Sequence, residues 1–286
     1  MKNAAEAAHG GYAISTYAMK ELPLEQAVQT MASRGWTAIE IMCEFAHREW
    51  VDWPLERVDA LAEWGRAHGI RWSVHAPIED VNPAEEDELL RARGLYVLRR
   101  CIERAERLGA AYVVVHPGAM DSGDDYAEDA WERRRVPRRA AGRHAGCRAA
   151  SRSRTCRTRG CSARAWRSSS DVCSSDLLVR VVTAAGSPRL GLVYDVGHAH
   201  MLGGGYALQG LREAAPHLLG LHVSDNRGSA DDHDAVGKGT VPLEALLAGL
   251  PELAAERHVM ELCTLEDAEL SAARVLELRS GQAVGV

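Results

Sequence analysis

The chain has 286 residues, of which 46% are hydrophobic and 26% are charged, and its formal net charge is -6 at pH 7. About 250 residues is typical of a single α/β barrel, so this length can bury one large core. No apolar run approaches the roughly 20 residues that a membrane span needs, and residues 1–16 lack the apolar core of a signal peptide. We therefore expect a cytoplasmic protein with no membrane partner, and the acidic balance argues against a nucleic-acid partner.

Strand-like and helix-like segments alternate along most of the chain. The predicted strands are residues 12–16, 37–44, 71–77, 111–118, 190–200, 219–226 and 257–264. The predicted helices are residues 23–36, 54–70, 88–110, 177–188, 207–218, 242–253 and 265–281. Gly35, Gly69 and Gly109 end three of these helices, as left-handed C-terminal caps do.

Short β-rich runs that alternate with helices predict a parallel sheet covered by helices. Seven strands are visible, with a gap where a fifth strand should lie. The prediction is an α/β fold, a (β/α)8 TIM barrel whose fifth βα unit is disrupted or missing. Residues 1–286 would form this single domain.

The gap coincides with an atypical segment at about residues 137–176. Its first part is crowded with Arg, Ser and Cys, and four of the seven Cys lie in or beside it without the paired spacing of a zinc site. Ser169–Leu177 reads SSDVCSSDL, which can be encoded by the bases of a common short-read sequencing adapter. A long structureless loop is uncommon inside a compact domain. We interpret the segment as non-native, a frameshift followed by adapter sequence, and the open alternative is a genuine basic loop.

A shift of the reading frame supports this interpretation. If Ala150–Thr158 is back-translated with suitable synonymous codons and read one base earlier, it gives Leu-Ala-Leu-Glu-Asn-Leu-Pro-Asp. That peptide has the pattern of a buried strand, and its Glu is encoded across the Ser153/Arg154 boundary. We expect residues 137–176 themselves to lack a well-formed fifth βα unit.

Polar residues at the ends of the predicted strands are the strongest functional signal. They are His75, His116, Asp195, His198, His222 and Glu261, and the loop after strand seven adds Asp231 and His233. The C-terminal ends of barrel strands converge on one mouth, where active sites are built. Imidazole and carboxylate groups supply the nitrogen and oxygen ligands of divalent metals. A single histidine at a strand end is more often structural, but five strands that end in such residues predict a metal site.

The motifs HAP, HPG, DVGHAH, HVSD, DDH…GKG and MEL resemble the xylose isomerase-like barrel superfamily. That group contains sugar and sugar-phosphate isomerases and epimerases as well as endonuclease IV. The resemblance covers the chain except for about residues 137–176. It implies a divalent metal cofactor (Zn, Mn, Mg or Co) and a small sugar or polyol substrate. It leaves the substrate, the metal and the possibility of a homo-oligomer open.

The resemblance also implies how the ligands are shared. Asp195, His222 and Glu261 would bind one metal together with a glutamate on strand five. His75 and His116 would bind a second metal with that same glutamate. His198, Asp231 and His233 match the third metal site of the endonuclease branch. The strand-five glutamate is absent from this sequence, so we expect the chain as written to be inactive.

Two further residues are candidates for substrate binding. Glu40 ends the second strand and could contact substrate hydroxyls, although a solvated rim carboxylate fits equally well. Lys238, in the GKG motif, could bind a phosphate or carboxylate group of the substrate, but a surface lysine without a role in binding is the simpler interpretation.

Two enzyme classes fit these residues. In a sugar isomerase or epimerase, Glu261 and the missing glutamate would be the acid–base pair, and His198 is a second catalytic candidate. In an abasic-site endonuclease, a zinc cluster would activate water. The loops after strands three, six and seven are neutral or acidic, whereas a DNA-binding surface needs basic groups. We therefore favour the sugar enzyme. A barrel that only binds a ligand is a third, non-catalytic alternative.

Overall fold

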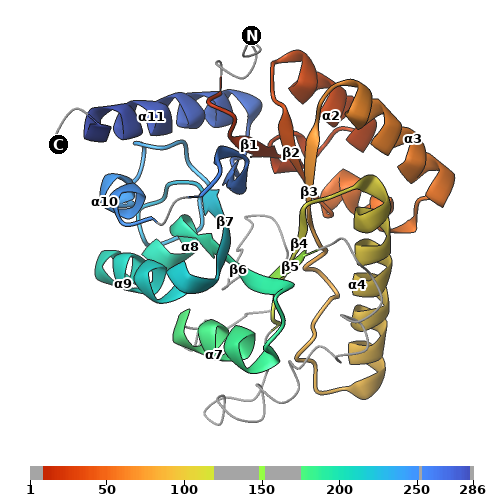
Figure 1. Ribbon diagram of the computed structural model, residues 1–286. Helices are drawn as coiled ribbons and strands as arrows, with labels where there is room; N and C mark the ends of the chain where they lie inside the picture. Colours follow the sequence, from red (N-terminus) through yellow and green to blue (C-terminus); the bar gives the residue numbers. More distant parts are fainter. Residues whose placement is uncertain (1–8, 119–147, 152–174, 251–252, 284–286) are drawn as a thin grey trace.

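The computed structural model describes residues 9–118, 148–151, 175–250 and 253–283. In these residues eight parallel strands close into a barrel, each paired with its neighbours in chain order. The strands are β1 (Ala13–Ser15), β2 (Ala38–Met42), β3 (Arg71–His75), β4 (Tyr112–Val115), β5 (Arg148–Ser151), β6 (Leu190–Asp195), β7 (Leu218–Val223) and β8 (His258–Met260). Helices surround the strands (Figure 1), as the alternating pattern predicts.

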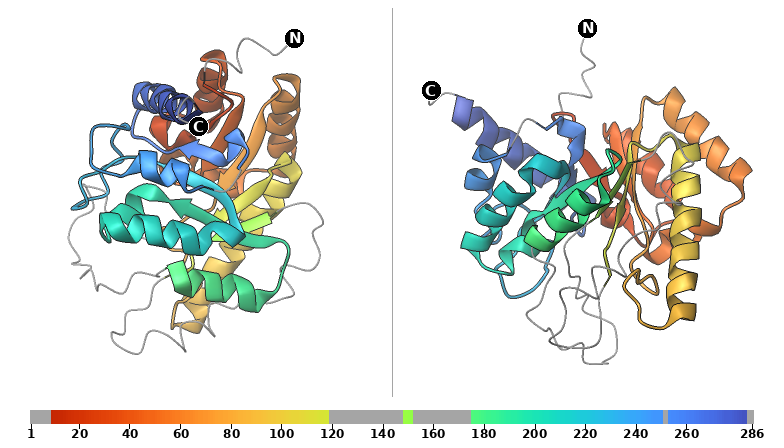
Figure 2. Two further views of the ribbon diagram at one scale, coloured as in Figure 1. Left: turned by 60° about the vertical axis from the view of Figure 1, so that its left-hand side comes forward. Right: turned by 60° about the horizontal axis from the view of Figure 1, so that its bottom comes forward.

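The helices alternate with the strands along the chain. The α-helices are α2 (Leu24–Ser33), α3 (Leu55–Ala67), α4 (Glu88–Leu108), α7 (Ser175–Ala185), α8 (Val196–His200), α9 (Gly204–Ala214), α10 (Leu243–Ala248) and α11 (Leu265–Ala283). The 3-10 helices are η1 (Thr16–Met19), η2 (Phe45–Asp52), η3 (Ala215–His217) and η4 (Ala255–Arg257). In Figure 2, right, α2, α3 and α4 cover one side of the barrel and α7, α9 and α11 the other. Among the described residues, no helix has the length and apolar character of a membrane span.

The three predicted cap glycines are confirmed. Gly35, Gly69 and Gly109 follow α2, α3 and α4 with φ of 89°, 66° and 81°. This left-handed region costs glycine little because it has no Cβ, so each helix can end there and the chain can turn into the next strand.

The fifth position of the barrel was predicted to be disrupted or missing. The structure places the four-residue strand β5 there, paired in parallel with β4 and β6. This corrects the stronger form of the expectation, that no strand is present. Ladder hydrogen bonds come from the backbone, so a short segment can complete the ring without the apolar run that β6 carries. The rest of the predicted non-native segment, apart from Ser175 and Asp176 at the start of α7, lies outside the described residues.

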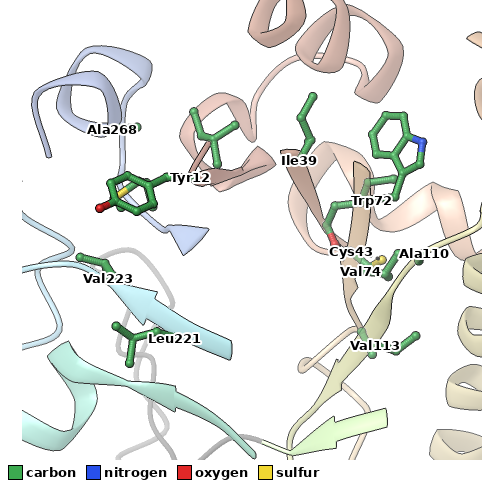
Figure 3. Packing of buried hydrophobic residues seen from close by; sticks show 14 of the residues in the cluster. Tyr12, Ile39, Cys43, Trp72, Val74, Ala110, Val113, Leu221, Val223 and Ala268 are labelled. Carbon is green, nitrogen blue, oxygen red and sulfur yellow. Dashed lines mark hydrogen bonds between the residues drawn. The ribbon is translucent and has the colours of Figure 1, made fainter. Parts of the chain in front are cut away.

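The main core lies between the strands and the helices. It takes outward-facing strand residues such as Ile39, Trp72, Val74 and Leu221, all of which are buried. Figure 3 shows residues of this cluster on β2, β3 and β4 and, across the barrel, on β7. Burial of these side chains against the helices holds the layer of strands and the layer of helices together.

The interior of the barrel changes from apolar to polar towards the C-terminal ends of the strands. Small clusters fill its lower part, one of Ala13, Ala38 and Val259 and another of Tyr112, Val114 and Val193. Inward-facing positions recur every second residue. The next inward positions after these residues are Ser15, Glu40, Glu261, His116 and Asp195. The strand period therefore stacks a layer of polar side chains on an apolar floor.

Candidate metal centre

One group of potential metal ligands joins the ends of three neighbouring strands. Asp195 ends β6, His222 lies on β7 and Glu261 directly follows β8. One ligand atom from each lies within 4.8 Å of the other two, and each residue is 1% exposed. Nδ1 of His222 lies 2.6 Å from Oε2 of Glu261. The three side chains thus converge on one buried point and offer one nitrogen and two carboxylate groups.

A second group contains His198, Asp231 and His233, which also meet within 4.8 Å and are buried. Oδ2 of Asp231 lies 2.7 Å from Nε2 of His198 and 3.1 Å from Nε2 of His233. Nδ1 of His198 lies 3.3 Å from Oδ2 of Asp195, so the His198 ring lies between the two groups. The two groups therefore form one continuous cluster.

His75 and His116 lie beside the first group. Their ring centroids are 5.1 Å apart, and the His75 ring is 5.9 Å from that of His222. Nδ1 of His75 donates a hydrogen bond to the Ala76 carbonyl at 2.8 Å. Because the carbonyl can only accept, Nε2 of His75 is the ring nitrogen that can bind a metal. All eight predicted ligands are therefore at the same end of the barrel.

Local packing explains the sequence DVGH at the end of β6. Asp195 caps α8, because its Oδ1 accepts a hydrogen bond from the His198 backbone N–H at 2.9 Å. This cap holds the two ligands Asp195 and His198 on the first turn of α8. A Cβ on Gly197 would lie only 2.6 Å from Oγ of Ser224 on the segment after β7. Glycine at this position lets the first turn of α8 approach β7 closely enough to join their ligands.

Asp225 organises the loop that carries Asp231 and His233. Its carboxylate accepts hydrogen bonds from the backbone N–H groups of Asn226, Gly237, Gly239 and Val241, at 2.9–3.0 Å. A Cβ on Gly239 would overlap this carboxylate. His233 itself adopts a left-handed φ of 50° and donates from Nδ1 to the Glu261 carbonyl at 2.7 Å. The loop is thus tied to both β7 and β8.

Two of the buried carboxylates have shifted pKa values. Burial alone would raise the pKa of Glu40, but the neighbouring His222 and His75 outweigh it and the pKa lies below its ordinary value. Burial likewise opposes ionisation of Asp231, and His198 and His233 hold the pKa of that carboxyl well below its usual range. Both groups are therefore anionic at neutral pH, as metal-site carboxylates must be.

The two residues expected to bind substrate lie in different surroundings. Glu40 is fully buried on β2, where it accepts a hydrogen bond from Ser73 at 3.1 Å and lies 2.9 Å from Nε2 of His222. These contacts favour a role in holding His222 over contact with substrate. Lys238 forms an ion pair with Asp267 at 2.7 Å, so its charge already has a partner.

Sequence reasoning assigned no role to Asp225 or Tyr17. The Tyr17 ring is tilted against His233 at 5.0 Å between centroids. The signal for Asp225 was present, since HVSD and GKG are the segments that its carboxylate joins. Tyr17 follows β1 without any metal-binding pattern, so only the fold could place it at the cluster.

The donor set of the cluster fits a divalent metal. Imidazole nitrogens and carboxylate oxygens suit zinc and manganese, and the carboxylates also suit magnesium. Second contacts orient the ligands, since His75 donates to a carbonyl and His222 faces Glu40. Such contacts accompany nearly all metal-binding histidines. The described residues supply three ligands at each of the two groups and two more histidines beside them.

Comparison with known proteins agrees with this fold. Residues 28–151 and 155–278 match the family described as the xylose isomerase-like TIM barrel. A curated relative, the uncharacterised protein MJ1311 of Methanocaldococcus jannaschii, is 24% identical over 245 residues, which cover 85% of this chain and 80% of the relative.

Three solved structures have the same fold. A D-tagatose 3-epimerase-like protein aligns with a TM-score of 0.77 and 22% identity over 96% of this chain and 100% of its own. An L-ribulose 3-epimerase aligns with a TM-score of 0.70 and 17% identity, over 96% and 98% of the two chains. The IOLI protein, solved with a bound zinc atom, aligns with a TM-score of 0.65 and 19% identity, over 96% of each chain.

Proposed function

The chain belongs to the xylose isomerase-like TIM barrel family, and we propose that it derives from a divalent-metal-dependent isomerase or epimerase of a sugar or sugar phosphate. The observation that carries this proposal is the buried convergence of Asp195, His222 and Glu261 at the barrel mouth. The epimerase names of two structural neighbours and the zinc in a third support the same class.

Asp195, His222 and Glu261 would hold the metal. A bound divalent cation would polarise a carbonyl oxygen and the adjacent hydroxyl of the substrate. Glu261 would take the proton from the carbon next to that carbonyl. In an isomerase it would return the proton to the neighbouring carbon, and in an epimerase a second carboxylate would deliver a proton to the same carbon from the opposite face. His198 faces a carboxylate at each ring nitrogen, and these contacts would hold its ring between the two groups of ligands.

The proposal includes a loss of activity in the chain as written. The family pattern places a second carboxylate on strand five, across the substrate from Glu261. Residues Arg148–Ser151, which form β5, contain no acidic side chain. Without it, proton transfer on the opposite face has no acid or base, and the metal loses a ligand. We propose that replacing residues 137–176 with the frame-restored segment recovers both the metal ligand and the proton transfer on the opposite face.

The second group of ligands favours one alternative function. His198, Asp231 and His233 could hold a further metal, and a multinuclear zinc cluster is suited to phosphodiester cleavage. An endonuclease IV-like activity on abasic DNA is therefore the second candidate. The acidic and neutral character of the loops around the mouth speaks against it, because a DNA-binding surface needs cationic groups.

One pair of assays separates the candidates. The frame-restored protein is incubated in deuterated water with ketoses and ketose phosphates, and in parallel with a duplex that contains an abasic site. Deuterium uptake next to the carbonyl without strand cleavage supports the isomerase or epimerase. Cleavage without deuterium uptake would assign the chain to the endonuclease class.

A further inference from the structure

Lys20 lies beside the metal-ligand cluster although it belongs to no metal-binding motif. It directly follows η1, which continues from β1 at the same end of the barrel as the cluster. Its Nζ is 4.0 Å from the centroid of the Tyr17 ring, and that ring is 5.0 Å from the His233 ring. The sum of these two distances is an upper bound, so the ammonium lies no more than about 9 Å from the centre of the His233 ring.

The charge of Lys20 has no carboxylate partner within 4 Å among residues 9–118, 148–151, 175–250 and 253–283. Lys238, the other lysine in these residues, forms an ion pair with Asp267. The ammonium of Lys20 instead lies against the rings of Tyr17 and Phe45, the latter at 4.9 Å. Aromatic faces attract a cation but do not neutralise it, so this charge remains able to bind an anion.

The second aromatic ring is held in an uncommon way. Phe45 has a φ of 54°, and a bulky residue in this left-handed region is an outlier that the surrounding structure must maintain. Phe45 is 43% exposed, and its ring lies 5.9 Å from the Tyr17 ring. The fold therefore places the Lys20 ammonium against the exposed Phe45 and the buried Tyr17.

The buried carboxylate of Glu44, the residue before Phe45, is turned towards other partners. Oε1 of Glu44 accepts hydrogen bonds from the backbone N–H groups of Ile78 and Glu79 and lies 3.3 Å from Arg48. Its charge is thus directed into the loop after β3. Lys20 is left as the cation that can meet a ligand above Tyr17.

We propose that Lys20, supported by Tyr17 and Phe45, binds an anionic group at the far end of the substrate, so that the substrate is a sugar phosphate or a sugar acid. This inference rests on the proposed sugar isomerase or epimerase function and narrows its substrate class. With single bonds of about 1.5 Å, a sugar chain of five or six carbons spans about 6 Å. This span lies within the upper bound of about 9 Å between the Lys20 ammonium and the centre of the His233 ring. The group of ligands that contains His233 is joined to Asp195 through His198.

Binding measurements test the inference without requiring turnover. The affinities of D-fructose, D-fructose 6-phosphate and D-fructuronate are measured by calorimetry in the presence of zinc, on the full chain as written and on the frame-restored chain. At least one anionic sugar should bind about 10- to 100-fold more tightly than fructose, the range expected for a hydrogen-bonded charge pair. The two anionic probes distinguish a phosphate from a carboxylate.

Three variants locate the effect. Lys20→Met keeps an apolar side chain on the aromatic rings but removes the charge. It should abolish the tighter binding of the anionic sugar and leave the affinity for fructose unchanged. Lys20→Arg should retain most of this tighter binding. Arg66→Met, which removes a positive charge from the exposed surface of α3, should retain all of it. Melting temperatures of the variants confirm that each one is folded.

Two results would overturn the inference, and they differ from failure of the proposed function. If fructose binds and Lys20→Met leaves the affinity for both anionic sugars unchanged, Lys20 is not the anion site although a sugar site exists. If no anionic sugar binds more tightly than fructose, the substrate class is wrong. If none of the three sugars binds and the abasic duplex is cleaved, the sugar-enzyme proposal fails as well.

Discussion

Nε2 of His222 lies 2.9 Å from Oε1 of Glu40, and both side chains are almost completely buried inside the barrel. When Nδ1 binds a metal, the ring proton lies on Nε2, and a carboxylate at Nε2 would stabilise it there. Nδ1 is the atom that faces Glu261, at 2.6 Å. Glu40 therefore supports the orientation of the central histidine of the cluster from the side away from Glu261.

Replacement of Glu40 should weaken metal binding although Glu40 is not a ligand. In the Glu40→Gln variant the amide keeps the shape but loses the charge that stabilises the His222 N–H, so zinc affinity should fall by about 10- to 100-fold. A chelator competition assay measures this change in the frame-restored protein. The exposed carboxylate variant Glu79→Gln is the control, and equal zinc affinity in both variants would show that Glu40 does not act on the metal site.

Loss of the Asp225 carboxylate should loosen the loop that carries Asp231 and His233. The Asp225→Asn side chain would present an amide N–H to backbone donors that now bind a carboxylate oxygen. Because hydrogen bonds to charged groups contribute about 1.5–3 kcal/mol each, the free energy of unfolding should fall by about 2–4 kcal/mol. Urea titration measures it. The neighbouring Asp232→Asn variant should change stability by less than about 0.5 kcal/mol, and an equal loss in both would refute the organising role of Asp225.

The lowered pKa of buried His258 should make the stability of the protein depend on pH. Burial, with a further contribution from Arg279, lowers the pKa of His258 to about 4 from 6.5. The unfolded chain therefore takes up a proton below pH 6.5 that the folded chain does not, and stability falls as the pH drops from 6.5 to 4. The full effect of this group is about 3 kcal/mol.

Unfolding curves measured between pH 4 and pH 7 test this dependence. In the His258→Gln variant, the amide oxygen can still accept from Arg279, and the loss of stability over this range should shrink by about 3 kcal/mol. The exposed His68→Gln variant serves as the control. A slope that His258→Gln leaves unchanged would mean that other groups cause the acid sensitivity.

The sequence predicts most of the fold because the signals of a βα barrel are local. Alternating apolar patterns mark the strands, and glycines such as Gly35 and Gly109 mark helix ends. It also predicts the ligands, because strand ends meet at the mouth wherever the barrel closes. The surroundings of Glu40 and Lys238 could not be predicted in this way. Their partners, His222 and Asp267, are distant in sequence, and only the closed barrel brings each pair together.

Lys20 shows the same limit in a different form. Nothing in the residues after β1 distinguishes it from a surface lysine. It lies near His233 only because both contact the ring of Tyr17 in the folded chain. The fifth strand is the opposite case. There the sequence lacks the apolar run of a barrel strand, yet backbone pairing with β4 and β6 closes the ring.

The most direct test of the proposed chemistry is exchange of the substrate proton next to the carbonyl. The frame-restored protein, loaded with zinc or manganese, is incubated with a ketose or ketose phosphate in deuterated water, and deuterium in the sugar is measured by NMR. The restored protein should incorporate deuterium, and Glu261→Gln should abolish the exchange, whereas the control Glu266→Gln should not. Undiminished exchange in the Glu261→Gln variant, or none in the restored protein with any sugar tested, would contradict the assignment of Glu261 as the base.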